Sequence, residues 1–228
     1  MSHSRSVEDF LKAVYRIQRR AYNAGEEESR VSTNALAEAL NILPPSVTEM
    51  ARRMAEAGLV DYRRYYGVRL TPEGERVALK VIRRHRLIEL YLVEQLGYAL
   101  HEVHDEAENL EHAVSDRFVD AIAGKLDHPT VDPHGDPIPS HDGRIITPDW
   151  VPLSDLVAGQ SGRVSRYTAH DDDMLQHIID KGFEMGAVVT VQAVDPFDGP
   201  LSVTVGGAAQ IIGRGVARCI MVDTGDTL

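Results

Sequence analysis

The feature that most constrains this chain is a set of imidazole and carboxylate side chains between residues 104 and 112. His104, Glu108, Glu111 and His112 follow one another at spacings of four, three and one. Residues three and four apart share one face of an α-helix. The pattern therefore predicts a helix that presents metal-ligand chemistry along one edge.

A second helix upstream repeats this arrangement with His85 and Glu89, which are four residues apart. Two helices that each present imidazole and carboxylate along one edge can enclose a divalent cation. The alternative is a solvated acidic helix, and the residues alone leave both interpretations open.

Length and composition limit the possibilities further. The 228 residues suit two or three small domains, and 43% hydrophobic residues permit real cores. No apolar run approaches the ~20 residues that a bilayer span needs, and the N-terminus lacks the apolar core of a signal peptide. Cys219 is the single cysteine, so no intrachain disulfide forms, and we expect it to lie buried in a strand. These features predict a soluble, cytoplasmic protein.

The net charge of −11 argues against a nucleic-acid partner, but the charge is unevenly distributed. Residues 1–85 hold 15 Lys and Arg against 11 Asp and Glu, whereas the remaining residues hold 9 against 24. A mildly basic N-terminal part is thus joined to a strongly acidic remainder.

The N-terminal part has the pattern of a winged helix-turn-helix. Apolar residues at helical spacing predict a helix over 6–22, and short amphipathic helices follow over 31–40 and 46–57. A turn at 41–45 joins the two short helices. Residues 59–71 then alternate like two strands of a hairpin wing around Tyr66 and Gly67.

Such a unit places the first turn of its second helix in the major groove of double-stranded DNA. The residues expected near base edges are Pro44, Pro45, Ser46, Thr48 and Glu49. Glu49 could accept from cytosine or remain a solvated carboxylate. The residues expected to meet phosphates are Arg52, Arg53, Arg63 and Arg64.

Three further helices are predicted, over 73–96, 101–115 and 115–126. Their wide apolar faces suggest a homodimer, and a pair of winged helices reads palindromic half-sites best. Prolines deny continuous helix to residues 127–152, which we interpret as an ordered arm and then a linker. Three loop histidines in this region have no expected metal role: His128, His134 and His141.

From residue 153 the pattern is that of short strands with glycine-containing turns, interrupted by a helix at about 171–181. We expect a small barrel. The predicted domains are a winged helix-turn-helix over 1–73, a metal-binding and dimerisation domain over 74–140, a linker over 141–152 and the barrel over 153–228. The fold class is mainly α with β.

Three segments carry a resemblance to a known family: Arg84–Glu89, Val103–His112 and Gly135–Pro139. With them the chain resembles the diphtheria toxin repressor family of metal-activated bacterial repressors over nearly its whole length. The resemblance implies an SH3-like (FeoA-like) fold for the C-terminal barrel.

The resemblance also implies a primary, activating metal site. Its four positions are Asp9, Glu108, Glu111 and His112 here. Iron-responsive members carry Met and Cys at the first two, so this chain is similar to the manganese transport regulator branch. Oxygen donors suit Mn(II), whereas soft sulfur ligands favour later transition metals. We expect Mn(II) as cofactor, with Fe(II) as the alternative, and binding of other divalent transition metals in vitro.

An ancillary site is implied at His85, Glu89 and His104, completed by Asp171 from the barrel domain. Met174 falls at the remaining ligand position and is a poor ligand for manganese, so His170 or Asp172 are alternatives. In two-domain manganese regulators a first-helix Glu joins a paired-metal cluster. Lys12 stands there in this chain, which favours separated sites.

The function implied is a manganese-dependent transcriptional repressor, a homodimer that binds palindromic operator DNA and controls metal-uptake genes, with no catalytic residues and no membrane partner. The alternatives are an iron(II)-dependent regulator of the same family and a non-DNA metal-binding adaptor. A metallohydrolase is a third alternative, but the chain offers no nucleophile or general base beyond the ligands themselves.

Overall fold

The computed structural model describes residues 4–23, 30–169 and 171–225, which form two compact units. The first unit comprises residues 1–85, 108–119 and 139–144, and the second comprises residues 86–107, 120–138 and 145–228. The loop expected over 24–29, and His170, lie outside the described residues.

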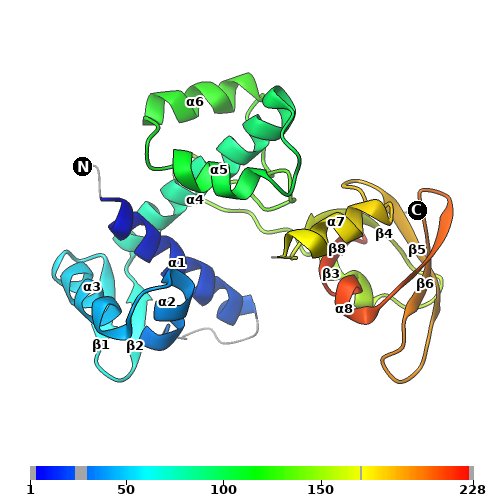
Figure 1. Ribbon diagram of the computed structural model, residues 1–228, viewed down its shortest axis with the longest axis horizontal. Helices are drawn as coiled ribbons and strands as arrows, with labels where there is room; N and C mark the ends of the chain where they lie inside the picture. Colours follow the sequence, from blue (N-terminus) through cyan, green and yellow to red (C-terminus); the bar gives the residue numbers. More distant parts are fainter. Residues whose placement is uncertain (1–3, 24–29, 170, 226–228) are drawn as a thin grey trace. The chain divides into compact units, whose positions relative to one another are not determined.

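The first unit begins with three helices, α1 (Arg5–Asn23), α2 (Thr33–Leu40) and α3 (Pro44–Glu56), which pack against one another (Figure 1). The hydroxyl of Ser32 accepts a hydrogen bond from the Ala35 N–H and so caps the start of α2. Asn41 ends α2 in the left-handed conformation, with φ of 51°. The helix-turn-helix predicted from the sequence is present.

Helix α3 starts two residues earlier than predicted, because Pro44 and Pro45 form its first turn rather than the preceding turn. Proline is tolerated there since the first helical N–H groups have no intrahelical partner. The buried face of α3 carries Val47, Ala51 and Met54 at spacings of four and three. The opposite face of α3 is exposed to solvent.

The wing is a two-stranded antiparallel hairpin of β1 (Val60–Arg63) and β2 (Gly67–Leu70). Its turn comprises residues 64–66, one residue earlier than predicted, with Tyr65 at a φ of 70°. Val31 forms a bridge to Val68 through two hydrogen bonds of 2.8 Å. Gly67 makes this close approach possible, because a Cβ there would lie 2.3 Å from the Val31 carbonyl oxygen.

Three helices follow, α4 (Pro72–Leu96), α5 (Val103–Leu110) and α6 (Asp116–Lys125). Helix α5 is shorter than the predicted 101–115. Glu111 and His112 therefore lie in the turn directly after its last residue.

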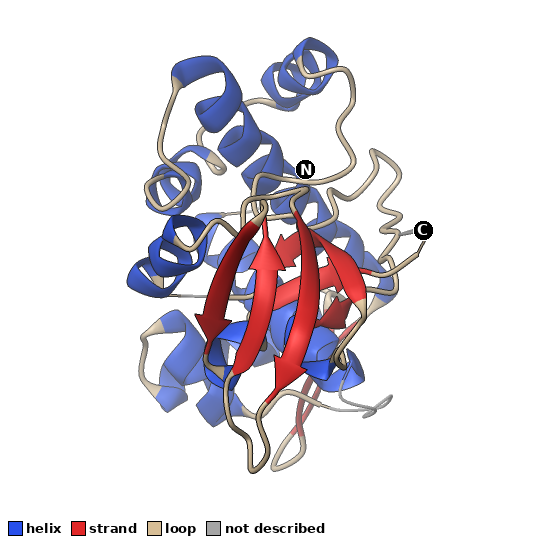
Figure 2. Ribbon diagram, turned by 90° about the vertical axis from the view of Figure 1, so that its right-hand side faces the viewer, coloured by secondary structure: helices blue, strands red, loops and turns tan. Residues whose placement is uncertain are grey.

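The second unit holds an antiparallel sheet in the order β3-β8-β4-β5-β6-β7 (Figure 2). The strands are β3 (Val151–Pro152), β4 (Ser161–Tyr167), β5 (Val188–Val194), β6 (Leu201–Val205), β7 (Ala208–Ile212) and β8 (Ile220–Asp223). A 3-10 turn η1 (Leu153–Asp155) and helices α7 (Asp172–Asp180) and α8 (Arg214–Ala217) complete it. The core includes Leu153, Phe183, Val189 and Ile220, all fully buried.

The fold class predicted from the sequence is confirmed, but closure of the barrel is not. Within residues 145–169 and 171–225, strands β3 and β7 form the two ends of the sheet, without pairing to each other. Cys219 also differs from the prediction: it lies in the turn before β8, partly exposed, because α8 occupies residues 214–217.

Among the described residues, no helix is both long enough and apolar enough to cross a bilayer.

Replacing Gly67 with alanine tests the contact of the wing with Val31. We expect Gly67→Ala to lower the free energy of unfolding by ~1–3 kcal/mol for its positive φ, and by more because of the clash with the Val31 carbonyl. Gly58→Ala is the matched control: Gly58 also has a positive φ, 72°, but a Cβ there meets nothing within 4 Å. Equal losses for both variants in urea unfolding would contradict this account.

Candidate metal centre

The first unit brings together the four residues predicted as the primary site. Asp9 comes from α1, Glu108 from the last turn of α5, and Glu111 and His112 from the turn after it. Their ligand atoms all lie within 4.8 Å of one another. Glu111 is fully buried and His112 is nearly so. The site therefore joins α1, which packs against α2, α3 and β2, to the end of α5.

His112 is held in the orientation that a metal ligand requires. Its Nδ1 atom lies 2.7 Å from Oε2 of Glu8 and donates to it, because a carboxylate only accepts, and its Nε2 atom is directed at Asp9 and Glu111. Glu8 is itself only 7% exposed. The sequence analysis missed Glu8, because its contact with His112 joins residues 104 positions apart and has no local signal.

The Nε2 atom of His112 lies beside two carboxylates of the same group. Within the described residues Nε2 is buried and makes no hydrogen bond, although Oδ1 of Asp9 is 2.8 Å away and Oε1 of Glu111 is 3.2 Å away. Buried polar atoms rarely remain unpaired. A cation among these three atoms would satisfy them, so the residues fit a divalent metal ion of hard or borderline character.

Lys12 lies in the same pocket. Its Nζ donates to Oε1 of Glu108 at 2.6 Å and to the two oxygens of Glu111 at 2.7 and 2.9 Å. His85 Nδ1 donates to the same Glu111 carboxylate at 2.7 Å. The Glu111 carboxylate is thus held by groups from α1 and α4.

These contacts decide the electrostatics of the carboxylates. Burial opposes ionisation of Glu108, but the charge and hydrogen bond of Lys12 outweigh it and lower the pKa of Glu108. Burial is likewise outweighed at Glu111, whose pKa is lowered by the hydrogen bond from His85 and the charge of Lys12. Burial raises the pKa of Asp9, opposed in part by His112. Both glutamates are therefore ionised and ready to bind a cation at neutral pH.

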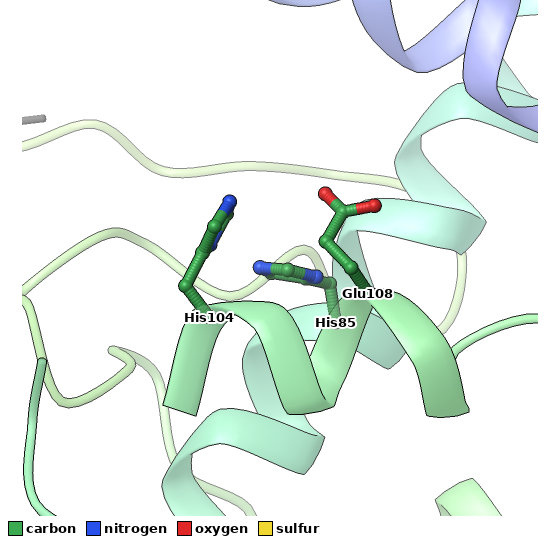
Figure 3. A group of neighbouring side chains, drawn as sticks. All are labelled: His85, His104 and Glu108. Atoms are coloured by element: carbon green, nitrogen blue, oxygen red, sulfur yellow. The ribbon is translucent and has the colours of Figure 1, made fainter. Parts of the chain in front are cut away.

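The residues predicted for the ancillary site lie on α4 and α5. His85 and Glu89 are one turn apart on α4, and Nδ1 of His104 is 3.3 Å from Oε1 of Glu89. Figure 3 shows His104 and Glu108 one turn apart, with ring and carboxylate on the same side of α5, together with His85. Asp171 is the N-cap of α7, and its Oδ1 accepts from the Met174 N–H at 2.9 Å. A metal role for Asp171 stays a prediction.

A second group of potential ligands lies within the second unit. Glu89, Asp132 and His134 offer ligand atoms that all lie within 4.8 Å of one another. Glu89 and Asp132 are 2% and 5% exposed, so two carboxylates are buried side by side. The sequence analysis gave His134 no metal role, because a lone loop histidine carries no spacing signal.

The loop that carries Asp132 and His134 is closed on itself. Oδ1 of Asp132 accepts from the backbone N–H groups of His134 and Asp136 at 2.9 and 2.8 Å. The loop is also attached to β4: the Tyr167 N–H donates to the His134 carbonyl at 2.8 Å, and Asp136 pairs with Arg166 at 2.7 Å. The loop is therefore rigid enough to position ligands.

The electrostatics of this second group favour a cation. Burial raises the pKa of Asp132 well above its usual range, and the nearby charges of Asp136 and Glu89 act in the same direction, against Arg86. Burial also lowers the pKa of His134, which keeps its imidazole neutral. A neutral imidazole beside buried carboxylates is a typical environment for a divalent metal.

The residues predicted to face DNA are exposed on α3 and the wing. Thr48 is half-buried and donates to the Pro44 carbonyl at 3.1 Å. The guanidinium of Arg64 stacks over the ring of Tyr65 at 4.9 Å from its centroid. The other residues of the set are exposed: Pro44, Pro45, Ser46, Glu49, Arg52, Arg53, Arg63 and Arg64. Their contacts with DNA stay a prediction.

Three family models match this chain. Residues 3–68 match the family model "Iron dependent repressor, N-terminal DNA binding domain". Residues 71–140 match "Iron dependent repressor, metal binding and dimerisation domain", and residues 151–224 match "FeoA domain".

Two relatives and one solved structure illustrate the similarity. The diphtheria toxin repressor of Corynebacterium efficiens is 35% identical over 165 residues, covering 70% of this chain and 68% of the relative. The HTH-type transcriptional regulator MntR of Lysinibacillus sphaericus is 34% identical over 118 residues, 52% of this chain and 79% of the relative. A structure described as a manganese-dependent transcriptional repressor complex with manganese is 40% identical, with a TM-score of 0.85, covering 96% of this chain and 99% of that one.

Fold, site and relatives together define a DNA-binding repressor of the metal-dependent regulator class. The chain belongs to the diphtheria toxin repressor family, also described as iron-dependent repressors, and has a FeoA-like domain over residues 151–224. The resemblance read from the sequence is confirmed. Proteins of this family are transcriptional regulators, not enzymes.

Glu8 provides the first test of the site. We expect Glu8→Gln to weaken Mn(II) binding about 10- to 100-fold, because the weaker acceptor no longer fixes the tautomer and ring orientation of His112. Isothermal titration of the purified chain measures the affinity. Asp105→Asn, which removes an exposed carboxylate of α5, is the control and should leave the affinity unchanged. Wild-type affinity in Glu8→Gln would contradict the assigned role.

Asp132 provides a test of the second group. Asparagine keeps the Oδ1 acceptor that closes the loop but removes the buried charge. We expect Asp132→Asn to raise the melting temperature of the metal-free chain by about 2–4 °C, which for a chain of this size is ~1 kcal/mol. The same variant should lose the stabilisation that metal gives at this group. A lower melting temperature of the metal-free variant would show that the Asp132 carboxylate does not destabilise the metal-free chain.

Proposed function

We propose that this chain is a manganese-dependent transcriptional repressor, which binds palindromic operator DNA as a homodimer and controls metal-uptake genes. A regulator that binds the chromosome acts in the cytoplasm, and we assign it there. The observation that carries the proposal is the donor set of the primary site: Asp9, Glu108, Glu111 and the Nε2 lone pair of His112, all oxygen or imidazole nitrogen.

The donor set favours manganese over softer ions. Mn(II) binds weakest in the series of first-row divalent metals, so selectivity for it depends on hard ligands and geometry rather than on raw affinity. Three carboxylates and one imidazole meet that requirement. Iron(II) is the alternative within the family, and the titrations below distinguish the two metals.

The position of the site explains how metal binding would reach the DNA. Asp9 belongs to α1, which packs against α2, α3 and β2, whereas Glu108, Glu111 and His112 belong to the end of α5. A metal bound by residues of both elements would fix α1, and with it α2 and α3, against the end of α5. When bound, the ion would neutralise the negative charges of the three carboxylates. Helix α1 would connect the site to α3.

We further propose the second group, Glu89, Asp132 and His134, as a second metal site, with His85, His104 and Asp171 as the other candidate ligands. Its support is the burial of the two carboxylates beside a neutral imidazole. This site would stabilise the loop on β4 rather than act directly on α1.

On the DNA side, α3 would enter the major groove with Pro44, Pro45, Ser46, Thr48 and Glu49 near base edges. Arg52, Arg53, Arg63 and Arg64 would contact phosphates. A homodimer would present two such helices to half-sites ~34 Å apart. Phe118 on α6, 48% exposed although apolar, supports a partner surface in the first unit.

The experiment that tests the function measures binding to DNA fragments from upstream of transporter genes, by fluorescence anisotropy, with and without Mn(II). We expect metal to increase operator affinity about 5- to 150-fold, the usual range of allosteric coupling. Asp9→Ala should abolish this increase while leaving a folded dimer, because it removes the one ligand contributed by α1.

Two controls sharpen the experiment. Anaerobic titration with Fe(II) beside Mn(II) distinguishes the iron-dependent alternative, which predicts stronger activation by Fe(II). Arg63→Ala should weaken binding to all sequences alike and reduce the salt dependence by about one counterion. Failure to bind any fragment with metal present would favour the non-DNA adaptor.

A further inference from the structure

The tip of the wing exposes two neighbouring aromatic side chains. Tyr65 and Tyr66 are 89% and 75% exposed, although most of each side chain is apolar. The guanidinium of Arg64 stacks over the Tyr65 ring, where the electron-rich face of the ring attracts a cation. The tip therefore presents one flat, positively charged unit, the pair of Arg64 and Tyr65, with Tyr66 next to it in the chain.

Tyr65 is held at the tip against its backbone preference. The Tyr66 N–H closes the turn by donating to the Arg63 carbonyl at 3.0 Å, and Tyr65 inside the turn has a φ of 70°. Glycine or asparagine usually occupies such a position, because a bulky side chain is strained there. Glycine would form the same turn with less strain. The Tyr65 ring thus does not serve the folding of the turn, and a strained, exposed side chain indicates a role in binding.

The rest of the wing holds this tip in place. Val68 exchanges two backbone hydrogen bonds of 2.8 Å with Val31, and the pairing of β1 with β2 continues up to Arg63, next to the turn. The side chain of Gln18 on α1 accepts from the Leu70 N–H at 3.0 Å. A surface that is fixed before binding loses less conformational entropy when it binds.

The charge of the wing favours a polyanion as its partner. Residues 59–71 carry three arginines and one aspartate, a net charge of +2, in a chain whose net charge is −11. The aspartate is Asp61, which pairs with Arg30 and lies 3.6 Å from Arg63. It lies on β1, opposite Arg69, rather than in the turn. The tip itself is therefore cationic and aromatic, which suits DNA.

The minor groove of DNA fits a tip of this shape. It is about 6 Å wide, too narrow for a helix, but it admits arginine and flat side chains between its walls. Where the minor groove narrows, the phosphates of both strands strengthen the negative potential that attracts an inserted guanidinium. The ring fixes one face of the Arg64 guanidinium and leaves the edges of this cation directed outward. Helix α3 would meanwhile occupy the major groove.

We propose that the wing tip binds the minor groove beside the segment read by α3, with Arg64 between the phosphates of the two strands and Tyr66 against the sugars. Tyr65 is a positioning residue that acts through Arg64. Because the 2-amino group of guanine projects into the minor groove, the tip disfavours G·C pairs there. The inference rests on the proposed function, because it takes operator DNA as the partner.

The test compares two DNA fragments that differ only in the minor groove. The upstream fragment that binds most tightly with Mn(II) is made with either G·C or inosine·cytosine pairs flanking each protected half-site. Inosine lacks the 2-amino group but keeps the major-groove atoms of guanine. Fluorescence anisotropy measures the affinity of the full chain with Mn(II) for each fragment. We expect a preference of about 5-fold or more for the inosine fragment, as for one unfavourable base pair.

Two variants separate the ring from the charge. Tyr65→Gly suits the backbone of the turn, so its melting temperature should equal or exceed that of the unmodified chain. It should lose the preference for inosine without a change in salt dependence, because Arg64 is retained. Arg64→Ala should lose the preference and also reduce the salt dependence by about one counterion. Tyr22→Ala is the matched control, because Arg19 stacks over Tyr22 on α1 at 5.2 Å from its centroid, and it should bind as the unmodified chain does.

Equal affinity of the unmodified chain for the two fragments would overturn the minor-groove contact while leaving the proposed function intact. A Tyr65→Gly protein that keeps the preference would overturn it as well. A melting temperature of Tyr65→Gly below that of the unmodified chain would show that the ring serves the fold, which also contradicts this inference. If the unmodified chain binds no fragment with Mn(II), the proposed function fails, and this inference fails with it.

Discussion

The structure depends on the ion pair that joins the turn after α5 to α1. Glu111 is fully buried, and it is held there by Lys12 from α1 and His85 from α4. Burying a carboxylate costs several kcal/mol unless partners compensate for it. The buried carboxylate of Glu111 lies where α1, which packs against α2 and α3, meets the turn after α5. Under the proposed function, an ion that enters among these carboxylates would change the strength of that attachment, and α1 would transmit the change to α3.

The same logic explains why the two groups of potential ligands differ in kind. The primary site lies between helices of the first unit, so a metal there would act on the DNA-binding elements. The second group is built on α4 and on the loop held to β4 by Tyr167 and Arg166. A metal there would connect a helix to the FeoA-like domain. We therefore propose a switching role for the first site and a structural role within the second unit for the other.

Much of this architecture was predictable from the sequence, because it follows from the spacing of residue types within short segments. The spacing of His104, Glu108, Glu111 and His112 predicted a helix edge, and the structure confirms the helix as far as Leu110. The winged helix-turn-helix followed from the periodicity of residues 31–57 and the alternating wing.

The features that could not be predicted from the sequence depend on contacts between residues far apart in the chain. Glu8 orients His112 across 104 positions, and His134 joins Glu89 only because the Asp132 side chain closes its loop. Neither contact has a local signature. The open edge between β3 and β7 likewise depends on long-range pairing, which short strands with glycine turns do not specify. Pro44 and Pro45 were misplaced by two residues because proline serves both as a turn former and as a first helical residue.

The central claim is that a single ion joins Asp9 to Glu108, Glu111 and His112. Anomalous diffraction at the manganese edge, from crystals of the full chain grown with Mn(II), tests it most directly. The account predicts one strong peak in contact with Asp9 and with Nε2 of His112, and with Lys12 still paired to Glu111. A peak away from Asp9, or two peaks within this pocket, would contradict it.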